Sequence, residues 1–181
     1  MIQIEMNHAM KMRAWNYLKE NNIANRGRFD GSKKDQFVGL LGEMAVWDFL
    51  DLSPKKTWDT TGQWDGGVDL VSPYGLTFDI KTVRRTVDPK PHFEVNVLES
   101  QMSYDVESYI FCSVNERTSV VTICGFIFKN DFIRDAEYIA RGTERMRDNG
   151  TPLKFRASTY LMKISELTDI KYLYNLYHHD K

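Results

Sequence analysis

Apolar residues recur three or four positions apart near the start of the chain, at Met10, Ala14, Trp15 and Leu18. This spacing predicts a helix over residues 7–20. A second helix is predicted from an N-cap at Ser32 to about Leu50, because Asp35 stands three positions after Ser32, as in a short capping box. From Phe37 onward this second helix is apolar almost all round, so we expect it to be buried.

Alternating apolar and polar positions predict strands in the middle of the chain. Pro73 and Gly75 punctuate two apolar runs, so residues 66–82 predict two short strands joined by a tight turn. Residues 92–97 alternate cleanly and predict a third strand of this hairpin sheet. Further strands are expected over residues 55–59, 109–114, 120–128 and 155–164.

The last third of the chain mixes helical and irregular patterns. Helical spacing predicts a helix over residues 129–141 and a short C-terminal helix opened by Ser165. Residues 142–154 are polar and lack a regular pattern. Helices and strands thus alternate along the chain, which predicts an α/β protein, and a length of 181 residues suits one domain over residues 1–181.

The hairpin carries the candidate chemistry. Asp79 and Lys81 lie two positions apart on the second strand, so their side chains point to the same face. Asp69 lies on the first strand, where hairpin pairing brings it beside Asp79. Two carboxylates and one ammonium that converge in this way are costly unless a cation lies between the acids. The pattern therefore predicts a metal site for phosphodiester cleavage.

A fourth charged group comes from the buried helix. Residues three or four positions apart share a helix face, which places Gly39, Gly42 and Glu43 on one side. Each glycine costs about 1 kcal/mol relative to alanine, and we expect the pair to let the helix approach another element closely. Glu43 is then held in a poorly hydrated contact. The alternative is a purely structural glutamate, paired with a neighbour such as Lys81.

The sequence contains Asp-x-Lys three times, but only Asp79-Ile80-Lys81 meets the geometric requirement. The copy at Asp88 contains a proline, which is poorly suited to a strand interior. The copy at Asp169 falls in a helical pattern, where residues two apart do not share a face.

The order Gly39, Gly42, Glu43, then Asp69, then Asp79-Ile80-Lys81 resembles the PD-(D/E)XK nuclease superfamily. The resemblance covers roughly residues 32–114, and one departure is Val68 where many members have proline. It implies a restriction endonuclease-like fold, which is a small mixed sheet flanked by helices, with an αβββαβ core. That core would span about residues 32–128, with an extra N-terminal helix and a C-terminal elaboration of strand and helix over residues 129–181.

The same resemblance implies a role for each site residue. Asp69 would be the bridging metal ligand and Asp79 the second acid, with the Ile80 carbonyl beside them. Lys81 would be the catalytic lysine, and Glu43 would complete the metal shell. Oxygen ligands of this kind favour Mg²⁺ or Mn²⁺ over zinc. The expected activity is metal-dependent hydrolysis of DNA. A non-catalytic DNA-binding or interaction module on the same fold is the alternative.

The charge composition limits how the protein could bind nucleic acid. The net charge is −1, with 24 basic and 25 acidic residues, so any surface that binds nucleic acid must be local. The candidate contacts for the DNA backbone follow the hairpin or lie in an earlier basic loop, with a solvated loop as the alternative reading in each case. They are Arg84, Arg85 and Lys90, and Arg26 and Arg28.

The chain shows neither a signal-peptide pattern nor an apolar run of membrane-spanning length, which predicts a cytoplasmic protein that does not enter a membrane. Cys112 and Cys124 fall in two apolar runs and are expected to be buried thiols of a reducing compartment, with a disulfide as the alternative. Cleavage of both strands of a duplex would favour a homodimer.

Overall fold

The computed structural model describes residues 1–21, 32–52, 67–147 and 150–178. Four α-helices and two 3₁₀ turns occur in these ranges: α1 (His8–Asn21), α2 (Lys33–Phe49), α3 (Lys129–Asp135), α4 (Lys171–His178), η3 (Glu99–Gln101) and η4 (Ile164–Glu166). The strands of the same ranges are β1 (Ile2–Glu5), β2 (Leu70–Val71), β3 (Thr77–Arg85), β4 (Glu94–Leu98), β5 (Ser108–Asn115), β6 (Val120–Phe128), β7 (Glu137–Ile139), β8 (Glu144–Met146), β9 (Pro152–Lys154) and β10 (Thr159–Lys163). The strand predicted over residues 55–59 and the predicted DNA-backbone contacts Arg26 and Arg28 lie outside the described ranges.

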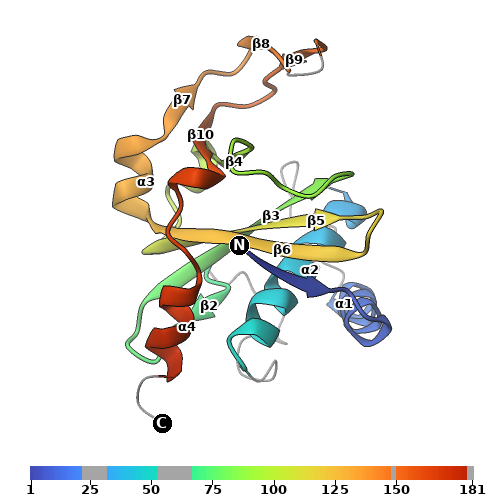
Figure 1. Cartoon of the computed structure of the whole chain (residues 1–181). Coiled ribbons are helices and arrows are strands. Elements are labelled where there is room, and N and C mark those ends of the chain that lie inside the picture. The colour runs from blue at the N-terminus through green and yellow to red at the C-terminus, as the bar shows by residue number, and fades with distance from the viewer. Residues whose placement is uncertain (22–31, 53–66, 148–149, 179–181) are drawn as a thin grey trace.

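A five-stranded mixed sheet forms the centre of the molecule, in the order β1-β6-β5-β3-β2 (Figure 1). Strands β3 and β5 pair in parallel, and the other neighbours in this sheet pair antiparallel. A smaller sheet has the order β4-β10-β7, and β8 pairs with β9 in a separate hairpin. The predicted α/β class with a mixed sheet is therefore confirmed.

The central sheet is covered on both faces, and each face has its own apolar core. Helices α1, α2 and α4 pack on one face around Phe78, Ile80 and Trp47. On the other face, Tyr109 and Phe111 pack with Phe132 of α3 and with residues of β4 and β10. Every residue of β5 is buried, which fits a strand enclosed between two layers.

Several predicted elements are confirmed. Helix α2 begins after Ser32, whose hydroxyl accepts a hydrogen bond from the Asp35 amide at 3.3 Å, while the Asp35 carboxylate accepts one from the Ser32 amide at 2.9 Å. This reciprocal pair is the predicted capping box. The hairpin β2–β3 and the strands β5 and β6 also lie where the pattern placed them.

Other assignments were wrong. Strand β4 does not extend the hairpin sheet; it pairs with β10, because the second edge of β3 is already occupied by β5. The helix predicted over residues 129–141 ends at Asp135, and Glu137–Ile139 pairs with β10 as strand β7. The specific αβββαβ core is accordingly not confirmed.

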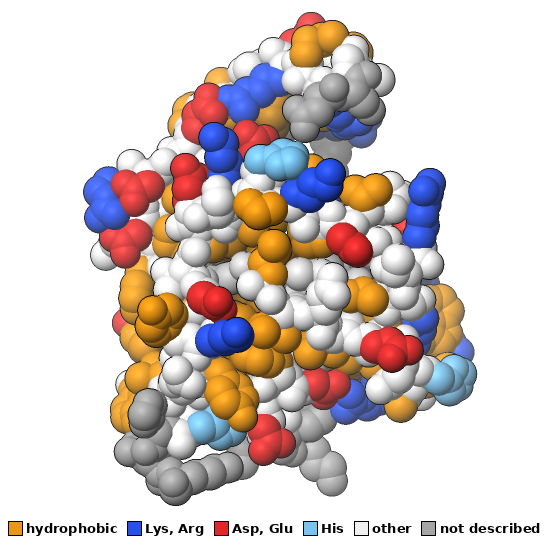
Figure 2. Space-filling model, in the orientation of Figure 1, with side chains coloured by type: hydrophobic (Ala, Val, Ile, Leu, Met, Phe, Trp, Pro, Cys, Tyr) orange, Lys and Arg blue, Asp and Glu red, His pale blue; other side chains and the backbone are white. Residues whose placement is uncertain are grey.

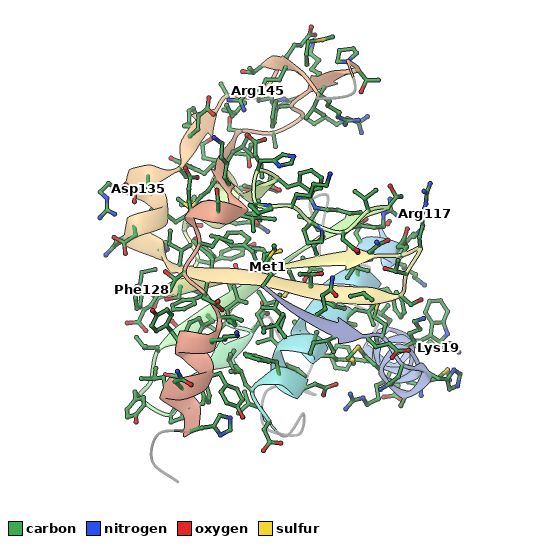
Figure 3. The ribbon with its side chains drawn as sticks, in the orientation of Figure 1. Met1, Lys19, Arg117, Phe128, Asp135 and Arg145 are labelled. Atoms are coloured by element: carbon green, nitrogen blue, oxygen red, sulfur yellow. The ribbon has the colours of Figure 1, made fainter. Side chains whose placement is uncertain are left out.

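The residues 140–158, described except for 148 and 149, project from the body of the molecule (Figures 1 and 2). We call this segment the arm. It was predicted to be irregular, but it contains the β8–β9 hairpin. At its base the Gly142 amide donates to the Phe155 carbonyl at 2.8 Å, and the Phe155 amide donates to the Thr143 carbonyl at 2.9 Å. Figure 3 shows Arg145 on the arm. Its guanidinium contacts the Glu94 and Glu137 carboxylates, which connects the arm to β4 and β7.

Cys112 and Cys124 are both free thiols and both buried. None of the helices in the described ranges is long and apolar enough to cross a membrane.

Candidate active site

Strand β3 brings Asp79 and Lys81 together. The Lys81 ammonium lies 2.6 Å from the Asp79 carboxylate, and both side chains are largely buried. The parallel register places Asp79 beside Tyr109 and Lys81 beside Phe111, so the two charges face the second apolar core and not helix α2. The predicted convergence of these two residues on one face is therefore present.

Asp69 lies at the open end of the β2–β3 hairpin. Its amide donates to the Phe78 carbonyl at 2.9 Å, and its carboxylate accepts a hydrogen bond from the Ile80 amide at 2.7 Å. When the β2–β3 register is continued by one residue, Asp69 stands opposite Asp79. The N–H and C=O of one strand residue point to the same side, so the Ile80 carbonyl points to the same edge as the Asp69 carboxylate.

The electrostatics of this edge centre on Asp69. Burial, followed by the negative charges of Glu43 and Asp79, raises the pKa of the Asp69 carboxyl well above its usual range. The Ile80 amide and the Lys81 ammonium act in the opposite direction but do not offset this rise. Burial and the charge of Asp79 likewise raise the pKa of Tyr109. Asp69 therefore carries the electrostatic cost of placing three carboxylates near one another.

Glu43 reaches this edge from helix α2, on the opposite face of the sheet from Asp79. Helix α2 can approach β3 closely because Gly42 has no side chain: an added Cβ would overlap the Thr82 hydroxyl and lie 3.0 Å from Thr82 Cβ. The expected role of Gly42 is thus confirmed. The same expectation was wrong for Gly39, since an added Cβ there would meet no atom within 4 Å.

Tyr104 lies next to the candidate site but was not among the site residues predicted from the sequence. The Lys81 ammonium lies 5.6 Å from the centre of the Tyr104 ring, within cation–π range. Gly67 adopts a φ of +86°, and an added Cβ there would lie 2.5 Å from the Tyr104 ring. The Lys129 ammonium donates to the Tyr104 carbonyl at 2.6 Å. The usable sequence signal was Gly67, since glycine tolerates a positive φ close to a ring.

The donor set fits a hard divalent ion in chemistry. Asp69, Asp79, Glu43 and the Ile80 carbonyl offer only oxygen atoms, which suit Mg²⁺ or Mn²⁺. Across the described ranges, no group of three His, Cys, Asp or Glu side chains is arranged to hold a metal ion by itself. Mg²⁺ is commonly held by one or two carboxylates with water and substrate phosphate, so a pair centred on Asp69 suffices.

The predicted backbone contacts separate into different environments. Arg84 is exposed and lies 3.9 Å from the Glu116 carboxylate. Arg85 is partly buried: its guanidinium stacks 4.9 Å from the Phe93 ring centre and donates to the Glu94 carbonyl at 2.7 Å. Burial lowers the pKa of Arg85. Lys90 is exposed in the β3–β4 connection.

No protein-family model matches this chain, and no curated protein matches it at a significant level. The class that the fold defines is a mixed α/β protein. The resemblance to the PD-(D/E)XK nucleases therefore stays a prediction from the sequence motif.

Proposed function

We propose that this protein is a metal-dependent nuclease that hydrolyses DNA phosphodiester bonds at the β2–β3 edge, with Mg²⁺ or Mn²⁺ as its cofactor. The observation that carries the proposal is the meeting of Asp69 with Asp79 and Lys81, while Glu43 acts on Asp69 from α2. Such a cluster is costly in an apolar setting and is typical of sites that do chemistry.

Asp69 and Asp79, together with the Ile80 carbonyl and Glu43, are the groups that would hold the ion. A bound divalent ion supplies Lewis acidity toward the phosphoryl oxygens and activates water for attack at neutral pH. A cation beside Asp69 would also offset the carboxylate repulsion that raises the pKa of this residue.

Lys81 is the catalytic residue of this proposal. Its ammonium is held by the Asp79 carboxylate and by the face of the Tyr104 ring, which fixes its direction. From there it orients the attacking water and counters the negative charge that develops on the phosphoryl group. Asp79 thus serves both as a ligand and as the group that positions Lys81.

The experiment incubates circular and linear DNA with the purified protein in Mg²⁺, in Mn²⁺ and in EDTA. We expect cleavage in both metals and none in EDTA. Lys81→Ala and Asp79→Ala should each lower the rate at least about a hundredfold, the scale for losing a positioned acid–base or electrostatic group.

The matched control is Lys171→Ala, which removes the lysine of the Asp169-Ile170-Lys171 copy. Lys171 is exposed at the start of α4, so we expect the control to cleave like the original protein. Cleavage that persists in both Lys81→Ala and Asp79→Ala would remove the assignment.

A second candidate is a non-catalytic DNA-binding or interaction module on the same fold. The close pairing of Lys81 with Asp79 favours it, since this ion pair satisfies both charges without a metal ion. This candidate predicts DNA binding without cleavage in any metal.

A cytoplasmic location accompanies the proposal, since two buried free thiols suit a reducing compartment. A homodimer would place two such edges on the two strands of a duplex.

A further inference from the structure

A groove lies between the arm and the end of β3, with a cavity volume of about 1440 Å³. Figure 2 shows a recess between the projecting arm and the body, with Lys or Arg atoms on both sides of it. Residues of β3, β4, β9 and β10 line the groove, together with the N-terminal end of α2. Its cationic lining residues are Lys34, Arg84, Arg85, Arg147, Lys154 and Arg156.

The groove is positively charged in a protein whose net charge is −1. Among the described residues, two carboxylates line it, Glu94 and Glu116, against six cationic side chains. Glu116 pairs with Lys34 at 3.1 Å and with Arg84 at 3.9 Å. The local excess of positive charge that the overall composition hides is therefore concentrated here.

Three of these cations, Arg147, Lys154 and Arg156, come from the arm and are exposed. Arg147 and Arg156 lie within ion-pair distance of no carboxylate in the described part of the chain. Lys154 has a partner, the Glu144 carboxylate at 3.3 Å. Exposed guanidiniums of this kind are suited to bidentate contact with phosphate.

The groove continues the face of β3 that carries the candidate active site. Side chains alternate along a strand, so Lys81, Val83 and Arg85 point to one face, and Val83 and Arg85 line the groove. A strand rises about 3.3 Å per residue, which places the Arg85 position about 13 Å beyond Lys81. That length corresponds to about four nucleotide steps of a duplex strand.

We propose that this groove binds the phosphodiester backbone of a nucleic acid a few nucleotides away from the bond at Lys81. Arg147 and Arg156 of the arm hold one side of the strand, and Arg84 with Lys34 holds the other. The ligand class rests on the proposed function, but the groove itself is defined independently of the metal site.

The groove is preformed in the structure. The Arg145 contacts with Glu94 and Glu137 connect the arm to the smaller sheet, and Arg85 is fixed against Phe93. Preformed cationic walls bind a polyanion without the cost of ordering a loop. Contacts to the backbone alone carry no sequence information, so we expect binding with little sequence preference.

The test measures fluorescence anisotropy of short labelled single-stranded and duplex DNA in EDTA, where no cleavage occurs. Arg147→Gln/Arg156→Gln should raise the dissociation constant at least about tenfold at low salt. The slope of log K against log salt should shrink by about 1.4 on the single strand or about 1.8 on the duplex. The form of DNA, single-stranded or duplex, whose affinity falls more in the double variant is the form that the groove binds.

The matched control is Arg134→Gln/Lys171→Gln, which removes two exposed cations of α3 and α4 outside the groove. It should bind within about twofold of the original protein, and Arg147→Lys/Arg156→Lys should retain most of the affinity because the charge remains. A thermal melt of each variant checks that folding is unchanged.

Equal DNA affinity of Arg147→Gln/Arg156→Gln and the original protein would overturn the inference. Cleavage assays on the same samples separate the two proposals. If Arg147→Gln/Arg156→Gln binds DNA as the original protein does and DNA is cleaved, the nuclease proposal stands and the proposed role of the groove is wrong. If binding depends on the arm but no cleavage occurs in Mg²⁺ or Mn²⁺, the proposed role of the groove stands and the nuclease proposal is wrong.

Discussion

The β2–β3 edge and the groove beside the arm both gather charge, but they do so in opposite ways. At the edge, the charges are buried and act on one another: Lys81 lies 2.6 Å from Asp79, and the charge of Asp79 contributes to the raised pKa of Asp69. In the groove, Arg147 and Arg156 are exposed and stand apart from the carboxylates of the described residues.

This contrast separates two kinds of contribution to function. A buried cluster is strongly coupled, so the loss of one member leaves the others in an unfavourable state. Exposed cations are screened by salt, and each contributes a modest, separable share. We therefore expect the edge to govern the chemical step and the groove to govern affinity.

The largest expected effect concerns coupling at the edge. If Lys81→Ala and Asp79→Ala each lower the cleavage rate about a hundredfold, the double variant should be no more than about threefold slower than the worse single variant, because residues that act as a unit are not additive. In the groove, the effects of Arg147→Gln and Arg156→Gln on binding free energy should add within about 0.5 kcal/mol. Rate measurements and anisotropy on the two sets of variants make the comparison. Additive losses at the edge would contradict the coupled cluster.

A second prediction uses the two glycines of α2. Gly42→Ala would press a methyl group against Thr82 and should lower the free energy of unfolding by about 1–3 kcal/mol. Gly39→Ala meets open space and should raise it by about 0.5–1 kcal/mol. Because Gly42 holds α2 against β3, its substitution should also slow cleavage while binding in the groove stays unchanged. Denaturant melts and the two assays test this, and equal stability of both variants would contradict it.

The smallest effect is a pH dependence of stability. Burial and the charges of Glu43 and Asp79 raise the folded-state pKa of Asp69 above its value in the unfolded chain. Between these two values the folded protein keeps a proton that the unfolded chain has released, so Asp69 lowers stability progressively as pH rises through this window. Asp69→Asn keeps an acceptor for the Ile80 amide but cannot ionise. Its melting temperature relative to the original protein should therefore rise between pH 4 and 8, by about 2–4 °C for each kcal/mol.

The same variant tests the ion. Mg²⁺ or Mn²⁺ at about a hundred times its dissociation constant should stabilise the original protein by about 2.7 kcal/mol, and Asp69→Asn by much less. Parallel melting curves for the two proteins across pH, with no response to metal in either, would show that Asp69 is not the centre of the cluster.

The parts of the site that follow local rules were predictable from the sequence. Strand alternation placed Asp79 and Lys81 on one face, and the turn at Pro73 and Gly75 placed Asp69 beside them. Ser32 and Asp35 fixed the start of α2 through contacts three residues apart. Each of these results needs only neighbouring residues and the geometry of a strand, turn or helix.

The remaining parts depend on partners that are distant in the sequence. Strand β1 was not predicted, because its pairing with β6 joins residues such as Ile4 and Val121. The alternation in β4 predicted a strand correctly but could not show that β10 was its partner. The arm cations lie more than sixty residues after Lys81, and only the folded chain brings their surface beside the end of β3.

Strand β3 is held on both sides, by β2 in antiparallel and by β5 in parallel register along Phe78–Arg85. A single amino acid inserted into or deleted from this strand would exchange its two faces. Asp79 and Lys81 would then turn toward the layer of helices, and Phe78 and Ile80 would turn toward the apolar core on the other face of the sheet. Changes in chain length are consequently far less tolerable here than in the connections that follow.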